Sequence, residues 1–299
     1  MFDHIRSFRQ PFTTTEAIKL LQGQEGEAYL VAGGTDVALR AGRSVKVLVD
    51  ISRLGLSYIK RRGGGLHIGA TTTMAALEQS VLVRLTANGI LAHAAASCGS
   101  PQTRNMATIG GNLANASPAA DTATPLLVMG GQVVLQGMRA SRTLPLEAYF
   151  AGPHSTNSNR ELLVEIVVPR SKPNMAFSFQ RLARTEIDIA LVAVASAIRC
   201  DAKRRCTDVR IALGAVAPYP MRAHRAEAVL EGQLPSDKLL RQAADIASQE
   251  IAPITDVRAS AEYRREVAKV LTRRALEECV QRLAQENAVQ AGSRNGGAR

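Results

Sequence analysis

The alternation of apolar and polar residues predicts short helices and strands along the whole chain. Thr13 and Glu16 form a capping box ahead of an apolar face, which predicts a helix over residues 14–22. A helix-like segment follows Asp121 and ends at Met129, and further helices are predicted over residues 73–79, 86–97, 222–230, 236–249 and 260–285. The last of these helices has the strongest pattern, because its apolar stripe keeps helical spacing throughout.

Runs of β-branched and other apolar residues predict the strands between these helices. The expected strands cover residues 29–31, 45–51, 132–136, 161–168, 176–182, 190–199 and 207–216, and residues 58–70 form a hairpin that turns at Gly63-Gly64-Gly65. Two prolines around residues 170–175 indicate a domain boundary. Residues 288–299 are expected to form a flexible tail.

Composition indicates a globular protein of more than one domain. The chain has 299 residues, of which 46% are hydrophobic and 21% charged. No segment has the length and apolar character of a signal peptide or a membrane span, which predicts a soluble cytoplasmic protein. The net charge of +11 raises nucleic-acid binding as a hypothesis, but the basic runs are short and aromatic residues make only 4%. A solvated basic surface is the favoured interpretation.

The cysteines, histidines and arginines indicate no catalytic or metal site. Five residues separate the closest cysteine pair, Cys200 and Cys206, a spacing typical of neither a zinc site nor a redox dithiol. Cys98 is interpreted as a buried structural thiol. Arg222 and the histidines near it are assigned to domain packing or a subunit interface. Four arginines of the last helix are expected on its solvated face: Arg264, Arg265, Arg273 and Arg274.

Two glycine pairs could bind a phosphate group. Gly33-Gly34-Thr35 and Gly110-Gly111-Asn112 each follow an apolar residue and end in a polar one. Backbone N–H groups in such turns can approach a pyrophosphate closely, because no Cβ blocks the way. Either pair alone is more simply a chain turn. Two matched pairs favour a dinucleotide held from both sides.

Six segments, taken in order, resemble the FAD-binding or medium subunit of the molybdenum hydroxylases, the group of xanthine dehydrogenase and carbon monoxide dehydrogenase. The segments are AGGTD at 32–36, RNMATIGGNLA at 104–114, SPAAD at 117–121, DIALVAVA at 188–195, ALGAVAPYPMRAHRAEAVLEG at 212–232 and DVRASAEYRREVAKVLTRRAL at 256–276. The resemblance covers nearly the whole chain.

This resemblance implies an α+β fold with two domains. Residues 1–172 would form a two-subdomain FAD-binding fold of the vanillyl-alcohol-oxidase type, with subdomains at about 1–57 and 58–172. Residues 173–287 would form a C-terminal domain of antiparallel sheet and helices.

It also implies the residues that bind FAD. The pyrophosphate would be held by two groups of residues: Ala32, Gly33, Gly34, Thr35 and Asp36, and Thr108, Ile109, Gly110, Gly111 and Asn112. Asp121 would hydrogen-bond toward the sugar or ribityl part, and Ile166 would lie against the isoalloxazine ring. Gln180 stands where relatives often carry a lysine near the ring, and Ala107 stands where they usually carry glycine. Arg181 or Arg184 could replace the missing charge.

The function implied is electron transfer through FAD without a catalytic acid, base or nucleophile on this chain. A large partner subunit would carry the molybdenum cofactor, and a small one would carry iron–sulfur clusters. FAD would pass the electrons to NAD, oxygen, a quinone or another carrier. The alternatives are a free-standing FAD-dependent oxidase or reductase, a nucleic-acid-binding protein, and a scaffold whose flavin site has decayed.

Overall fold

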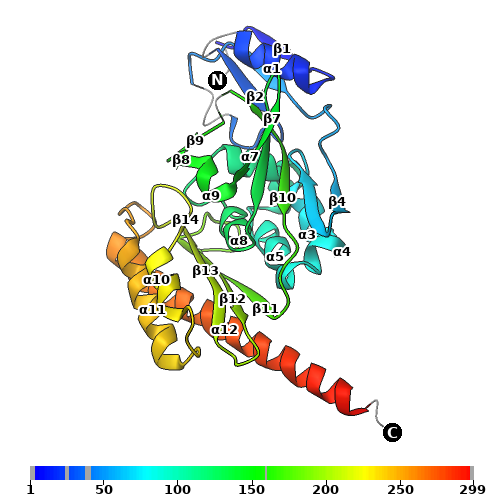
Figure 1. Cartoon of the computed structure of the whole chain (residues 1–299). Coiled ribbons are helices and arrows are strands. Elements are labelled where there is room, and N and C mark those ends of the chain that lie inside the picture. Colours follow the sequence, from blue (N-terminus) through cyan, green and yellow to red (C-terminus); the bar gives the residue numbers. More distant parts are fainter. Residues whose placement is uncertain (1–3, 24–26, 38–41, 159, 297–299) are drawn as a thin grey trace.

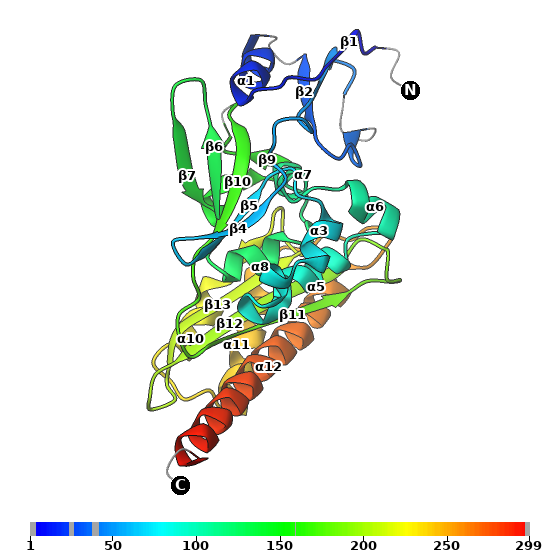
Figure 2. The same cartoon turned by 90° about the vertical axis from the view of Figure 1, so that its right-hand side faces the viewer.

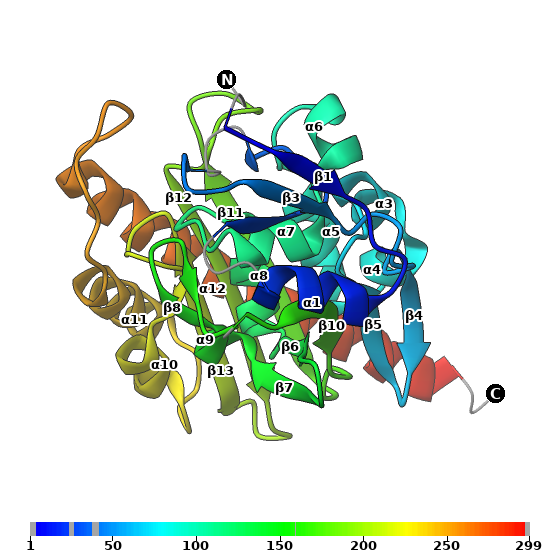
Figure 3. The ribbon, with the colours of Figure 1, turned by 90° about the horizontal axis from the view of Figure 1, so that it is seen from above.

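The computed structural model describes residues 4–23, 27–37, 42–158 and 160–296, and its elements form three stacked units (Figures 1 and 2). The smallest unit is a three-stranded parallel sheet with α1 (Thr14–Gly23) packed on it, seen from above in Figure 3. In the order β1-β3-β2, its strands are β1 (Ser7–Arg9), β3 (Val47–Asp50) and β2 (Ala28–Val31). Ala17 and Ile18 of α1 pack against the apolar side chains of β3.

The middle unit is a five-stranded antiparallel sheet with helices on one face. In spatial order its strands are β4 (Ile59–Arg62), β5 (Gly65–Gly69), β10 (Leu162–Val168), β6 (Gln132–Gln136) and β7 (Ser141–Pro145). The helices are α3 (Met74–Gln79), α4 (Val81–Arg84), the 3₁₀ turn Ala87–Gly89, α5 (Ile90–Ala96), α6 (Pro101–Met106), α7 (Ile109–Ala114), α8 (Ala123–Val128) and α9 (Leu146–Tyr149). A small two-stranded sheet, β8 (Phe150–Gly152) with β9 (Ser155–Thr156), lies beside α9.

The C-terminal unit is an antiparallel sheet covered on both faces. Its strands are β11 (Met175–Leu182), β12 (Val192–Cys200), β13 (Cys206–Gly214) and β14 (Met221–Arg222). Three helices cover one face: α10 (His224–Leu230), α11 (Asp237–Glu250) and α12 (Ala261–Gly296). Figure 2 shows α12 running the length of this sheet on the side away from α5 and α8. None of the described helices is long and apolar enough to cross a membrane.

The two faces of the C-terminal sheet carry side chains of different size. The buried apolar side chains of the middle unit form a first core. Toward this unit, β12 and β13 present small side chains that join the first core: Ala193, Ala195, Ala197 and Ala212. Toward the helices they present larger ones that form the second core: Val192, Val194, Ile198, Val209, Ile211 and Leu213. Because both faces are buried, these strands are nearly continuous apolar runs in the sequence.

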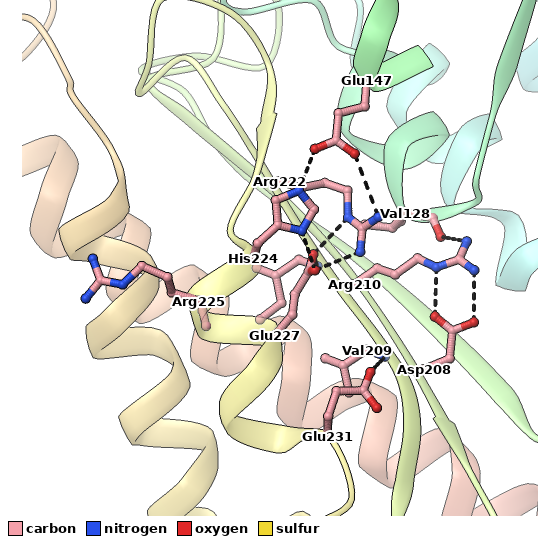
Figure 4. Close-up of polar contacts among 12 residues, drawn as sticks. Val128, Glu147, Asp208, Val209, Arg210, Arg222, His224, Arg225, Glu227 and Glu231 are labelled. Atoms are coloured by element: carbon pink, nitrogen blue, oxygen red, sulfur yellow. Dashed lines mark hydrogen bonds and ion pairs between the residues drawn. The ribbon is translucent and has the colours of Figure 1, made fainter. Parts of the chain in front are cut away.

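A polar junction also joins the last two units (Figure 4). Nε2 of His224 lies 2.6 Å from Oε1 of Glu147 in α9, and Glu227 accepts hydrogen bonds from Arg222 at 2.9 and 2.7 Å. Arg210 donates to the carbonyl of Val128 at 3.1 Å. The assignment of Arg222 and its neighbouring histidine to domain packing is therefore confirmed.

Several elements differ from the sequence prediction. The short helices α6 and α7 and the edge strand β7 were not expected, and α12 continues to Gly296, past the expected start of a tail at residue 288. The strand β7 alternates between exposed and half-buried positions and has no strong apolar signal. Arg264 is 2% exposed, which corrects its placement on a solvated face.

Candidate functional site

The first glycine turn follows β2 and packs directly on the loop between α6 and α7. A Cβ built on Gly33 would lie 1.8 Å from the carbonyl oxygen of Met106, so only glycine permits this contact. Gly34 has a φ of +71°, in the left-handed region that glycine adopts without strain. Two segments far apart in the sequence are thereby held together at the site.

This turn offers unpaired backbone donors. Within the described part of the chain, the N–H groups of Gly33, Gly34, Thr35 and Asp36 donate no hydrogen bond to the protein. The last three residues are exposed. A row of free N–H groups in a glycine turn is the donor set that a pyrophosphate needs.

The second glycine motif is the first turn of α7 and not an open loop. Thr108 caps this helix and accepts a hydrogen bond from the N–H of Gly111 at 3.1 Å. The N–H groups of Ile109 and Gly110 donate to the carbonyls of Thr72 and Ala70. Among the described residues, these backbone donors thus already have acceptors within the protein, and their contact with the pyrophosphate stays a prediction.

Of the two glycines of α7, Gly110 permits close packing. A Cβ on Gly110 would lie 2.5 Å from the carbonyl oxygen of Ala70, so this position brings α7 against the end of β5. Gly111 is exposed and leaves the helix surface open. Side chains link α7 to its surroundings: Nδ2 of Asn115 donates to Asp36 at 3.1 Å, and Oδ1 of Asn112 accepts from the hydroxyl of Thr122 at 2.7 Å.

Asp121 lies in a buried polar group formed by both halves of the chain. The guanidinium Nε of Arg181, on β11, is 3.4 Å from Asp121 Oδ1, and the Cys98 thiol interacts with the same carboxylate. Burial raises the pKa of Asp121 to about 6, although Arg181 partly opposes this shift. Burial, with the Asp121 carboxylate next, raises the pKa of Cys98 to about 12, so this thiol stays protonated.

The contact between Arg181 and Asp121 lacks hydrogen-bond geometry. Among the described residues, neither Nε of Arg181 nor Oδ1 of Asp121 has a hydrogen-bond partner, and both atoms are buried. Buried polar atoms are nearly always paired in proteins. This orphaned pair fits a ligand hydroxyl, which can donate to the carboxylate and accept from the guanidinium.

A cavity of about 410 Å³ lies beside Arg181, between α5 and the strand and helix that carry Gln180 and Glu278. Nε2 of Gln180 donates to Oε2 of Glu278 on α12 at 2.8 Å. The hydroxyl of Ser178 donates to the same oxygen at 2.5 Å, and Arg282 pairs with the other carboxylate oxygen at 2.5 Å. The side chain of Gln180 is thus fixed at the cavity wall.

The structure does not bring every expected residue to this site. Ile166 has no exposed surface and lies in the first core between Ile68 and Val133 of the neighbouring strands. Ile109 is also fully buried. Arg184 pairs with Asp188 on the exposed loop after β11, whereas Arg181 reaches the site.

Glu278 and Asn115 lie at the candidate site, and sequence reasoning missed them. Each contacts a segment distant in the sequence: Glu278 lies 98 positions after Gln180, and Asn115 lies 79 positions after Asp36. The only local signal for Glu278 was its helical spacing from Arg282.

FAD fits the residues present. The free N–H groups of residues 33–36 would hold its pyrophosphate, and the orphaned atoms of Asp121 and Arg181 would meet a hydroxyl of its sugar or ribityl chain. The cavity beside Gln180 has the size and partial enclosure typical of ligand pockets.

Comparison with known proteins agrees with this geometry. The family described as the FAD binding domain in molybdopterin dehydrogenase matches residues 3–171, and the CO dehydrogenase flavoprotein C-terminal domain matches residues 177–279. A glyceraldehyde dehydrogenase medium chain of Sulfolobus acidocaldarius is 33% identical over 267 residues, covering 88% of this chain and 94% of that protein.

Two further relatives extend the match. A putative xanthine dehydrogenase FAD-binding subunit of Escherichia coli is 30% identical over 94% of this chain and 97% of its own length. A solved carbon monoxide dehydrogenase of Hydrogenophaga pseudoflava, lacking the Mo-pyranopterin moiety, contains a chain with a TM-score of 0.88 and 31% identity, covering 93% of this chain and 98% of that one. This protein therefore belongs to the FAD-binding subunits of the molybdenum hydroxylase family, and FAD is its cofactor.

Proposed function

We propose that this chain is the medium subunit of a three-part molybdenum hydroxylase complex and that it passes electrons through FAD. Electrons would arrive from iron–sulfur clusters of a small partner subunit, after a large molybdenum subunit has oxidised the substrate. They would leave to NAD or another acceptor. The relatives named medium chains of carbon monoxide and glyceraldehyde dehydrogenases support this role.

The observation that carries the proposal is the donor and acceptor set at residues 33–36, Asp121 and Arg181. These groups bind and orient a dinucleotide. FAD supplies the redox chemistry, because it takes up and releases electrons one or two at a time. The chain's own residues hold the cofactor in place: Gly33 and Gly34 open their backbone toward the phosphates, and Glu278 fixes the amide of Gln180.

We place the protein in the cytoplasm. We also place the boundary between its two domains between residues 172 and 173. Its four cysteines are free thiols, which supports a reducing compartment. The proline-flanked segment between β10 and β11 supports the boundary.

Co-purification tests the proposal directly. The full-length tagged protein is isolated from cells that also express the two proposed partner subunits. It is expected to co-purify with a molybdenum-containing subunit and an iron–sulfur subunit. Its flavin should be identified as FAD by chromatography after release.

Stopped-flow mixing separates this role from a free-standing oxidase. The purified FAD-loaded chain is expected to keep its flavin absorbance when mixed with the substrate of the complex, and to bleach only when both partners are added. Rapid bleaching of the chain alone would favour the oxidase. Reaction of the isolated flavin with NADH or a dye would not count against the proposal.

A further inference from the structure

Two cysteines face each other at the end of the hairpin that joins β12 to β13. Cys200 ends β12, Cys206 begins β13, and they are partners in the antiparallel register. Both are free thiols whose side chains pack at the second core. The five residues between them suggested that they are too far apart for redox chemistry, but the turn of the hairpin brings them opposite one another.

Backbone hydrogen bonds define the type of pair. The N–H of Cys200 donates to Asn174 at 3.1 Å and that of Cys206 to Gln233 at 2.9 Å, so neither is given to the other cysteine. The next residues toward the turn, Asp201 and Arg205, do share a hydrogen bond of 2.9 Å. Cys200 and Cys206 therefore face each other with no backbone hydrogen bond between them, just past a register shift between Arg199 and Cys200. In a regular ladder, this is the type of pair in which side chains approach most closely.

This pair type has the dimensions of a disulfide. The Cα atoms of non-hydrogen-bonded partners lie about 4.5 Å apart. Disulfides span Cα separations of roughly 4.4–6.8 Å. A bond between the two sulfurs would thus need little movement of the backbone.

The two thiols differ in exposure and in acidity. Cys200 is half-buried, whereas Cys206 has no exposed surface. The interaction between the two thiols lowers the pKa of Cys200 and raises that of Cys206. Burial and Asp201 oppose the shift of Cys200, and Arg204 adds to it. A half-buried thiol of lowered pKa beside a fully buried thiol is the arrangement of redox-sensitive cysteine pairs.

We propose that Cys200 and Cys206 form a reversible disulfide, with Cys200 meeting the oxidant and Cys206 resolving it. The oxidant class is a hydroperoxide. The Cys200 thiol releases its proton to solvent, its sulfur attacks the peroxide and the O–O bond breaks. Cys200 becomes a sulfenic acid, and the departing hydroxide or alkoxide takes up the proton that the thiol released. The sulfur of Cys206 then attacks Cys200, the S–O bond breaks, and the departing hydroxide takes the Cys206 proton to form water. Two electrons pass from the two sulfurs to the peroxide.

The disulfide would form away from the flavin site. Gln180 pairs with Val194, six positions before Cys200 on β12, which is about 20 Å along the strand. FAD absorbance can therefore report that the fold is intact during oxidation. Cys98 and Cys279 are buried, and burial raises the pKa of each, so both serve as internal controls.

Mass spectrometry of the FAD-loaded full chain tests the proposal. The chain is treated with an equimolar amount of hydrogen peroxide, quenched in denaturant with N-ethylmaleimide, and digested with trypsin without reductant. Trypsin cuts after Arg199, Lys203, Arg205 and Arg210, which leaves the two cysteines on separate peptides, 200–203 and 206–210. These peptides are expected to be linked after peroxide and separate after dithiothreitol, while Cys98 and Cys279 carry maleimide.

Contrary outcomes are equally definite. Maleimide on both Cys200 and Cys206 after peroxide would overturn the proposal, as would a link between two chains. Formation of the bond only in chains that have lost FAD absorbance would also overturn it, because oxidation would then follow unfolding.

Two variants test the separate roles. In Cys206→Ser, Cys200 is expected to accumulate as a sulfenic acid that dimedone labels, and in Cys279→Ser the linked peptides should form as in the parent chain. An FAD-loaded Cys206→Ser chain without dimedone on Cys200 would overturn the role of Cys200 as the reacting thiol.

Discussion

Arg181 of β11 carries its guanidinium Nε to 3.4 Å from Oδ1 of Asp121, a residue of the middle unit. Arg181 is thus the residue by which the C-terminal sheet would contribute to the proposed FAD site. Both atoms are buried and lack a hydrogen bond among the described residues, which supports the proposed contact with a ligand hydroxyl.

Asp121→Asn is expected to change how the stability of the FAD-free chain depends on pH. Burial raises the pKa of Asp121 from 3.8 to about 6, so the folded chain binds this proton more tightly than the unfolded chain. Asp121 therefore lowers stability as the pH rises from about 4 through about 6, by an amount on the order of 3 kcal/mol over the whole titration. Between about pH 4 and pH 6, the melting temperature of the variant should fall less than that of the parent chain. Asp237→Asn, on an exposed helix surface, is the control, and equal slopes for Asp121→Asn and the parent would contradict the prediction.

Substitutions in the first glycine turn should separate packing from phosphate binding. Gly33→Ala places a Cβ against the Met106 carbonyl and should lower both the melting temperature and the FAD content. In Gly34→Val the new side chain makes only an ordinary contact with Val31, but the backbone at this position has a left-handed φ. The variant should therefore lose about 1–2 kcal/mol of stability. Its side chain should also block the neighbouring N–H donors, so that FAD is lost. Gly23→Ala, with nothing within 4 Å, should leave both unchanged. Full FAD content in Gly34→Val would remove this turn from the site.

Gln180→Lys should raise the flavin reduction potential, because a cation near the ring favours the anionic reduced form. Glu278 lies 2.8 Å from the Gln180 amide and would neutralise part of the new charge. The double variant Gln180→Lys with Glu278→Gln should therefore show the larger rise in a redox titration. An unchanged potential in both variants would mean that position 180 is not beside the ring.

His224 should make the junction between the last two units weaker at alkaline pH. Burial acts to lower its pKa, but the hydrogen bond to Glu147 and the charge of Glu227 outweigh burial and Arg222, so the pKa is raised above 6.5. The charged ring thus stabilises the fold fully below about pH 6.5, and the contribution is lost as the pH rises through the folded-state pKa. Because His224 is 58% exposed, the effect should stay below about 1 kcal/mol. His224→Gln should lose less melting temperature than the parent between about pH 6 and pH 8, and parallel curves would refute the assignment.

Arg264→Met should strongly destabilise the C-terminal unit. The buried guanidinium donates to the carbonyl of Leu191 at 2.7 Å and to Asp256 at 2.9 Å. Its loss would leave the Leu191 carbonyl without this donor, whereas Asp256 would keep its hydrogen bonds with Arg258. A cost of about 3 kcal/mol is expected in denaturant unfolding. Arg274→Met, at an exposed position of the same helix, should cost almost nothing. Similar losses for the two variants would show that the contacts of Arg264 add no stability.

Local patterns predicted most of the fold. The long strands β10 to β13 and the helices α11 and α12 have apolar periods that determine their type, and Thr13 caps α1 as expected, since its hydroxyl accepts from the N–H of Glu16 at 3.2 Å. The helix α7 was missed because its glycine pair has low helix propensity. Its capping residue, Thr108, and the packing of Gly110 against Ala70 outweigh that propensity.

The site could be predicted only in part. Gly33 and Gly34 carry a local signal, because glycine pairs after a strand are typical of phosphate turns. The contacts of Arg181 with Asp121 and of Gln180 with Glu278 join separate segments, and no local pattern contains them. The buried state of Arg264 was hidden for the same reason, since the carbonyls it binds belong to other elements.

The row of alanines on the C-terminal sheet has a consequence for unfolding. Ala193, Ala195, Ala197 and Ala212 let the middle unit approach the sheet closely, and their methyl groups share the first core with its helices. Separating the two would expose that core as well as the sheet, so neither part can melt while the other stays folded. Calorimetry should therefore record a single cooperative transition for the described body of the protein, although the chain contains two family domains.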